Sequence, residues 1–86
     1  MDLIPEGIHQ DGFNIIALYC VTRNNISGGI TNIYDNKKNI IYTKQLFEGD
    51  MIILNDNKLF HDVSSIELYD KNKIGYRDVF VLTSID

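Results

Sequence analysis

The chain has 86 residues, 44% of them hydrophobic, and a formal net charge of −4. This length allows one domain, residues 1–86, and the even spread of apolar residues argues against disorder. No run of Lys or Arg exceeds two, and the acidic balance argues against a phosphate-binding surface, so we expect no nucleic-acid partner. No apolar stretch reaches membrane length and no basic start precedes a hydrophobic run, so we expect neither a membrane segment nor a targeting segment.

The single cysteine, Cys20, cannot form an internal disulfide. A reducing cytoplasm fits this composition best, and we predict a cytoplasmic protein. Cys20 lies inside an apolar run, and we therefore interpret it as a small core residue rather than a nucleophile.

Six apolar, β-branched runs alternate with polar turns along the chain, and little of the sequence has helical periodicity. The predicted strands cover residues 13–22, 29–34, 40–43, 51–54, 59–63 and 76–85. The first run is long and uncharged, which favours burial on both faces. Gly28-Gly29 and the polar segments 35–39, 55–57 and 70–75 are turn signals. Short strands at this spacing predict an all-β sandwich or jelly roll.

The two histidines of the chain stand near opposite ends of it, His9 within His9-Gln10-Asp11 and His61 within the fifth predicted strand. In an extended segment, residues i and i+2 point to the same side, so His9 and Asp11 can reach one metal ion. The third ligand has to come from another strand, and His61 meets that requirement. Two imidazoles and one carboxylate on one face of the ion form the ligand set of non-haem Fe(II) oxygenases.

Arg77 opens the last predicted strand and shares an alternation face with Val79, Val81 and Thr83. A guanidinium binds a carboxylate through two hydrogen bonds and stays charged even when buried. Arg77 is therefore the candidate that holds the far carboxylate of a dicarboxylic keto acid such as 2-oxoglutarate.

Each of these features has an ordinary structural explanation as well. With nine Asp in the chain, a His-X-Asp sequence arises easily by chance. His61 alone is equally compatible with a surface or core histidine, and Arg77 with a salt-bridge partner. A β domain without a metal remains the alternative at this point.

Four other polar residues carry weaker signals. Arg23 follows a buried run, and it either contacts a substrate carboxylate or anchors a loop through hydrogen bonds. Thr83 either adds a hydroxyl near the cosubstrate or is an ordinary strand threonine. Asp62 adjoins His61 but points to the opposite side of a strand, so we do not expect it to be a ligand, and Glu6 is expected to be solvated.

Four segments match a known family in order: PEGIHQDGF from Pro5, VTRNNISGG from Val21, LFEGDMIILND from Leu46 and GYRDVFVLT from Gly75. Together they resemble a bacterial family of 2-oxoglutarate/Fe(II) dioxygenases that includes free amino-acid hydroxylases of the L-isoleucine 4-hydroxylase type. The resemblance covers nearly the whole chain.

The resemblance implies that His9, Asp11 and His61 bind Fe(II) and that Arg77 binds 2-oxoglutarate. It implies a double-stranded β-helix, which is a jelly-roll, cupin-like fold. It also implies hydroxylation of a small substrate with O2, the substrate being a free aliphatic L-amino acid.

The resemblance includes one departure, because family members continue well before the PEGIHQDGF motif and here only four residues precede Pro5. The chain is similar to a C-terminal catalytic half, and we expect a jelly roll that is incomplete at the N-terminus. Such a chain is expected to be weakly stable, to form a homo-oligomer, or to depend on a missing N-terminal segment. An inactive metal-binding remnant and a cupin-like binding domain with another divalent metal are the alternatives to an active enzyme. The presence of only two histidines favours the dioxygenase arrangement over the cupin-like one.

Overall fold

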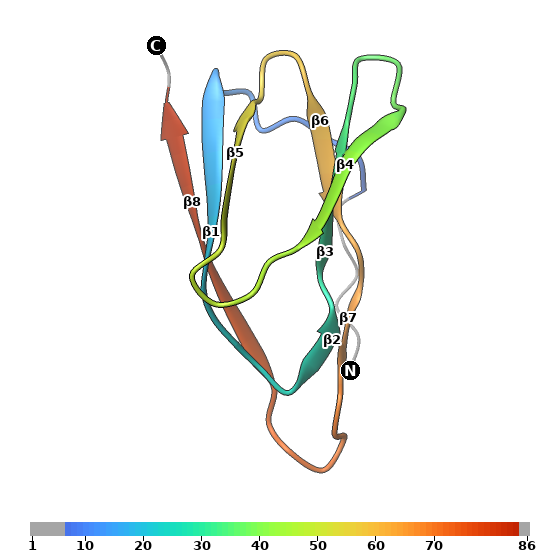
Figure 1. Ribbon diagram of the computed structural model, residues 1–86, viewed down its shortest axis with the longest axis vertical. Helices are drawn as coiled ribbons and strands as arrows, with labels where there is room; N and C mark the ends of the chain where they lie inside the picture. Colours follow the sequence, from blue (N-terminus) through green and yellow to red (C-terminus); the bar gives the residue numbers. More distant parts are fainter. Residues whose placement is uncertain (1–6, 85–86) are drawn as a thin grey trace.

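Eight strands and no helix form the described part, residues 7–84, of the computed structural model of this protein (Figure 1). Pro5, Glu6 and Ile85, which belong to the predicted motif and the last predicted strand, lie outside these residues. Within residues 7–84 there is no helix long and apolar enough to cross a membrane. The strands are β1 Ile15–Asn24, β2 Ile26–Gly28, β3 Ile30–Tyr34, β4 Ile40–Gln45, β5 Met51–Asn55, β6 Phe60–Val63, β7 Ile66–Leu68 and β8 Tyr76–Ser84.

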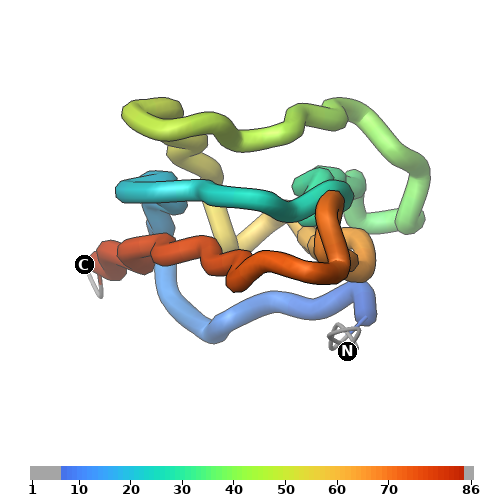
Figure 2. Tube along the Cα trace, turned by 90° about the horizontal axis from the view of Figure 1, so that it is seen from below, coloured from blue at the N-terminus to red at the C-terminus, as the bar shows by residue number. Residues whose placement is uncertain are grey.

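The strands form two three-stranded antiparallel sheets, ordered β5-β1-β8 and β4-β3-β6, and a short β2-β7 ribbon. Figure 1 shows the two larger sheets facing one another, with the ribbon at one end. Figure 2 shows the connection between β4 and β5 crossing between the sheets on one side of the molecule, and the blue segment before β1 crossing on the opposite side. The arrangement is all-β, as the sequence predicts.

The hydrophobic core lies between the two larger sheets. Alternate residues of β1 and β5 point inward, because successive side chains of a strand face opposite sides. They meet the inner face of β3 and the connection that follows β4. The buried cluster consists of Ile16, Leu18, Cys20, Ile33, Leu46, Ile52 and Leu54. Cys20 is fully buried, which agrees with its interpretation as a core residue.

The pairing of β1 with β8 contains one irregularity, which determines where Arg23 points. Cys20 pairs with Val79 and Thr22 with Asp78, so Val21 is an extra residue in β1. Such a bulge changes the alternation of the side chains that follow it. Arg23 consequently pairs with Arg77, and the two side chains share the inward face.

Three details differ from the sequence-based expectations. The first strand begins at Ile15 rather than Phe13, and Ile15 is exposed, so burial on both faces does not extend to its start. The strands β2 and β7 were not predicted, because each has only three residues. Their pairing depends on Gly28, whose φ is +84° and where a Cβ atom would lie 2.0 Å from the carbonyl oxygen of Ser65. Only glycine permits that approach.

Candidate metal centre

The three predicted metal ligands lie together at one point of the structure. Nε2 of His9 is 3.2 Å from Oδ1 of Asp11, and Nε2 of His61 is 3.5 Å from Oδ2 of Asp11. One ligand atom from each residue lies within 4.8 Å of the others. The imidazole centroids are 4.3 Å apart, with the rings tilted by 54°. This spacing matches atoms that share one metal ion at about 2 Å from each.

His9 and His61 are brought together by their backbones. The amide N–H of each residue donates to the carbonyl oxygen of the other at 2.9 Å, which forms an isolated antiparallel bridge. His61 belongs to β6, whereas His9 and Asp11 lie in an irregular segment before β1. Their expected position at the start of a strand is therefore not observed, although both side chains reach the same point.

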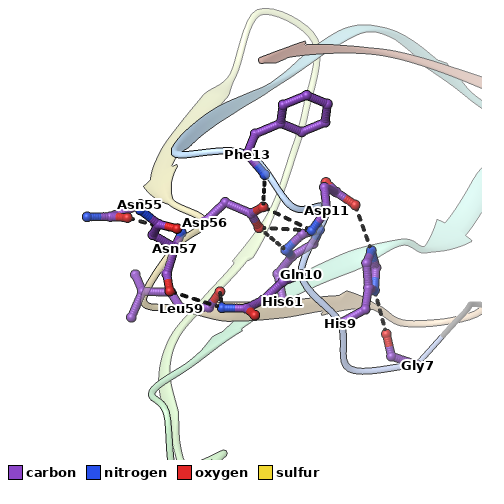
Figure 3. A network of polar contacts seen from close by, with 10 residues as sticks. All are labelled: Gly7, His9, Gln10, Asp11, Phe13, Asn55, Asp56, Asn57, Leu59 and His61. Carbon is purple, nitrogen blue, oxygen red and sulfur yellow. Dashed lines mark hydrogen bonds and ion pairs between the residues drawn. The ribbon is translucent and has the colours of Figure 1, made fainter. Parts of the chain in front are cut away.

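A buried carboxylate holds this irregular segment. Oδ2 of Asp56 accepts the backbone N–H groups of Asp11 at 2.9 Å and Phe13 at 3.0 Å (Figure 3). Asp56 is only 1% exposed and follows directly after β5. Backbone groups that no strand partner satisfies are thus paired with a side chain, as buried polar groups require.

The two imidazoles present the same nitrogen to the centre. Nδ1 of His9 lies 2.8 Å from the carbonyl oxygen of Gly7, and a hydrogen bond there requires the proton on Nδ1. Nε2 of His9 then carries the lone pair of the ring and faces Asp11. His61 likewise turns Nε2 toward Asp11 and Nδ1 toward Asp56.

Electrostatics favour an uncharged His61. Burial lowers the pKa of His61 below its usual 6.5, and the neighbouring His9 lowers the pKa further. Asp11, Asp56 and Asp62 act in the opposite direction on the pKa but do not reverse the shift. The neutral imidazole is the form that binds metal ions.

The three side chains line a cavity of about 260 Å³ between the two larger sheets. Its other walls are mostly apolar, with one cation and one hydroxyl among them. The remaining lining residues are Leu18, Thr31, Val63, Arg77, Val79 and Val81. Arg77, Val79 and Val81 share this wall, as the alternation in the last strand predicts. Thr83 is exposed and is not part of the lining.

Arg77 enters the cavity with unused hydrogen-bonding capacity. Its Nε and the hydroxyl oxygen of Thr31 are buried and have no hydrogen-bond partner among residues 7–84. Burial lowers the pKa of Arg77, and the nearby Arg23 lowers it further, while Cys20 opposes the shift. A guanidinium nevertheless stays protonated in proteins. Buried donors without partners fit a bound anion such as a carboxylate.

Arg23 anchors a loop through hydrogen bonds, which is one of its two predicted roles. One of its nitrogen atoms remains available for the other predicted role, contact with a substrate carboxylate. Its Nη2 donates to the carbonyl oxygens of Gly28 at 2.9 Å and Ile26 at 3.4 Å. The guanidinium lies 5.6 Å from the ring centre of Phe47. Its Nη1 is buried and has no hydrogen-bond partner in the described part of the chain.

Asp62 lies on the other face of β6, as the alternation predicts. Its carboxylate accepts hydrogen bonds from Asn32 at 3.0 Å and from the Tyr34 hydroxyl at 2.8 Å. Asp56 was not predicted as a site residue, because Asn55-Asp56-Asn57 has the composition of a turn. The signal was present in the alternation, since Asp56 continues the inward positions of Ile52 and Leu54.

The donor set fits iron. Two imidazole nitrogens and a carboxylate oxygen on neighbouring backbone segments are the ligands of the two-histidine, one-carboxylate Fe(II) site. The Asp11 carboxylate has both oxygens directed at the imidazoles, and the cavity provides space on the remaining side.

Comparison with solved structures identifies the fold. A bsmA homolog from Methylobium petroleophilum PM1 superposes with a TM-score of 0.80 and 26% sequence identity, over 94% of this chain and 33% of that one. IDO from Bacillus thuringiensis superposes with a TM-score of 0.77 and 22% identity, over 91% of this chain and 37% of that one. The chain therefore spans about one third of the length of either protein. The predicted double-stranded β-helix class is confirmed by these matches.

No curated protein matches the chain in sequence. A family model described as 2OG-Fe dioxygenase matches residues 2–83, which is nearly the entire chain. The chain thus belongs to the 2OG-Fe dioxygenase family, whose cofactor and cosubstrate are Fe(II) and 2-oxoglutarate.

Proposed function

We propose that the chain carries the iron centre of a 2-oxoglutarate-dependent dioxygenase that hydroxylates a small substrate. In this proposal His9, Asp11 and His61 are the iron ligands, and Arg77 binds the distal carboxylate of 2-oxoglutarate. The observation that carries it is the convergence of the three ligand atoms within 4.8 Å on the wall of a cavity that Arg77 also lines.

Iron bound at this centre would supply the oxidative decarboxylation of 2-oxoglutarate by O2, giving succinate and carbon dioxide, coupled to hydroxylation of a C–H bond. The protein residues bind and orient the cosubstrate and the substrate, and they exclude water from the cavity. His9, Asp11 and His61 would hold the ion from one side, and the cavity that they line lies next to them. Leu18, Val79 and Val81 make the cavity wall apolar, which strengthens the ion pair between Arg77 and a carboxylate.

We propose a free aliphatic L-amino acid as the substrate. The ordered sequence resemblance to amino-acid hydroxylases supports this class, and the small, largely apolar cavity is compatible with a short aliphatic side chain. Arg23 is the candidate for the substrate carboxylate, because it faces inward opposite Arg77 and its Nη1 is unpaired within residues 7–84.

The test is an anaerobic titration of the 86-residue chain with Fe(II) and 2-oxoglutarate, followed through the metal-to-ligand charge-transfer absorbance. The parent chain should develop the band, and alanine at His9, Asp11 or His61 should each abolish tight iron binding. Gln10→Ala is the matched control, since Gln10 stands between two ligands and its amide contacts Asn57 and Leu59 instead. Undiminished iron binding by His61→Ala would contradict the ligand assignment.

A second candidate is a metal-binding domain without turnover, which the convergence of the three ligand atoms supports equally. Succinate formation in air separates the two. Iron and 2-oxoglutarate binding with succinate production supports the enzyme, whereas binding without succinate supports the inactive domain. A cupin-like domain with another metal would give no 2-oxoglutarate-dependent absorbance.

A further inference from the structure

Asp56 is a fully buried carboxylate beside the candidate metal centre, with a side-chain exposure of 0%. It is not one of the three candidate ligands, and it pairs with no Lys or Arg among the salt bridges of residues 7–84. A carboxylate is costly to bury unless hydrogen bonds or charges compensate for the lost solvation. Its surroundings should therefore explain why it is there.

One oxygen of Asp56 holds the ligand-bearing segment. Oδ2 accepts the N–H groups of Asp11 at 2.9 Å and Phe13 at 3.0 Å, and Oδ1 accepts a second, longer bond from the N–H of Asp11 at 3.2 Å. The backbone N–H of Asp56 donates to the carbonyl oxygen of Asn14 at 2.9 Å. These bonds tie residues 11–14 to the end of β5. Because the segment is irregular, no strand ladder positions Asp11, and Asp56 performs that function.

The other oxygen faces the second histidine. Oδ1 of Asp56 lies 3.8 Å from Nδ1 of His61, which is longer than a hydrogen bond. Nδ1 of His61 is buried and makes no hydrogen bond within the described residues. A small rotation of the ring would bring the two atoms into hydrogen-bonding range. The contact is the counterpart of the one between His9 and Gly7.

We propose that Asp56 is a positioning residue of the metal centre, which fixes the backbone of Asp11 and keeps the proton of His61 on Nδ1. Nε2 of His61 is then left with the lone pair that binds the metal. Acceptors on the outer nitrogen of metal-binding histidines act in this way generally. The proposal rests on the proposed function, since it takes His61 and Asp11 as ligands.

Asp56→Asn separates the two tasks of the carboxylate. With its carbonyl oxygen at the Oδ2 position, asparagine can still accept the N–H groups of Asp11 and Phe13. Its NH2 group then occupies the Oδ1 position, where it gives up the longer bond from the Asp11 N–H and presents donors to Nδ1 of His61. The imidazole proton should move to Nε2, the atom that has to be free for the metal.

Asp62→Asn is the matched control. Asp62 is also an aspartate close to His61 in sequence, but its carboxylate binds Asn32 and Tyr34 on the opposite face of β6. The same chemical change at this position removes a charge near His61 and leaves the Asp56 carboxylate beside Nδ1 of His61 unchanged. General effects of lost charge are thereby separated from effects of lost orientation.

The experiment has two readouts on the 86-residue chain. Nitrogen-15 NMR of the metal-free protein identifies the protonated nitrogen of His61, and an Fe(II) titration measures affinity. The parent and Asp62→Asn should carry the proton on Nδ1, whereas Asp56→Asn should carry it on Nε2. Iron affinity should fall about 10–100-fold in Asp56→Asn, the range typical of outer-shell partners, and stay near the parent value in the control.

The outcomes distinguish this proposal from the assignment of the centre. A proton on Nε2 of His61 in the parent chain overturns the proposal without any variant, so it is tested even if Asp56→Asn fails to fold. Parent-like affinity and tautomer in Asp56→Asn overturn it as well. Absence of iron binding by the parent refutes the proposed function, and the tautomer measurement then still decides whether Asp56 orients His61.

Discussion

The two ends of the inner cavity differ in how their polar atoms are satisfied. At the histidine end, Gly7 accepts from one imidazole and Asp56 holds the backbone of Asp11. At the arginine end, Nε of Arg77 is buried on the cavity wall without a hydrogen-bond partner among residues 7–84. Nη1 of the paired residue Arg23, which does not line the cavity, is likewise buried without such a partner. The first end is organised by contacts within the chain, and the second keeps donors available for a ligand.

The difference follows from the backbone that carries each end. Arg77 and Arg23 stand on paired strands, where the ladder of hydrogen bonds positions the backbone that carries them. His9 and Asp11 stand on an irregular segment, which needs contacts from outside itself. Two positively charged side chains directly opposite one another destabilise a sheet, and an anion between them would relieve that repulsion.

Replacement of Arg77 by alanine should have the largest effect at the arginine end. The affinity for 2-oxoglutarate should fall by about 2–5 kcal/mol, the cost of removing one partner of a buried charge pair. Iron affinity should change little, because Arg77 is not a ligand. Lys73→Ala removes an exposed cation near the same strand and serves as the control in the titration. Equal 2-oxoglutarate affinity in Arg77→Ala and the parent would contradict the assignment of Arg77 and make Arg23 the next candidate for binding the distal carboxylate.

Gly7→Ala should weaken the histidine end to a smaller extent. Gly7 has a φ of +93°, and a side chain there is strained by about 1–2 kcal/mol even though the space around it is open. The strain should shift the carbonyl oxygen that accepts from His9 and reduce iron affinity. Gly49→Ala is matched, with a φ of +85°, open space and no contact with the centre. Thermal unfolding should show similar losses for both variants, and a metal titration should show a loss for Gly7→Ala alone.

The smallest expected effect is the pH dependence of the metal-free chain. The pKa of His61 is lower in the folded state than its usual 6.5, so the unfolded state binds a proton first as the pH falls. Stability should therefore decrease below about pH 6.5, until the pH passes the folded pKa of His61. Thermal midpoints with chelator between about pH 7.5 and pH 5 measure the slope, which His61→Gln should reduce. If the thermal midpoint of His61→Gln changes with pH as steeply as that of the parent, titratable groups other than His61 cause the pH dependence.

Strand alternation allowed much of this fold and cavity to be predicted. It located six of the strands, put Arg77 on one face with Val79 and Val81, and turned Asp62 away from His61. These inferences need only the two-residue period of a strand.

The remainder depends on tertiary contacts that the period does not contain. The strands β2 and β7 are too short to show a pattern, and their pairing follows from one glycine approach. Asp56 has the composition of a turn, and its hydrogen bonds with the backbone N–H groups of Asp11 and Phe13 join segments far apart in the sequence. The bulge at Val21 is hidden in the sequence, since apolar residues precede it on both faces of β1.

The bulge at Val21 also has a consequence for insertions and deletions in this family. Loss of Val21 would leave Cys20 and Arg23 facing inward, because Thr22 would then follow Cys20 directly on the outward side. Loss of Ala17 would instead turn the core residue Leu18 toward solvent. A deletion at Val21 is therefore expected to leave the orientation of the cavity residues unchanged, whereas a deletion at Ala17 is expected to change the hydrophobic core.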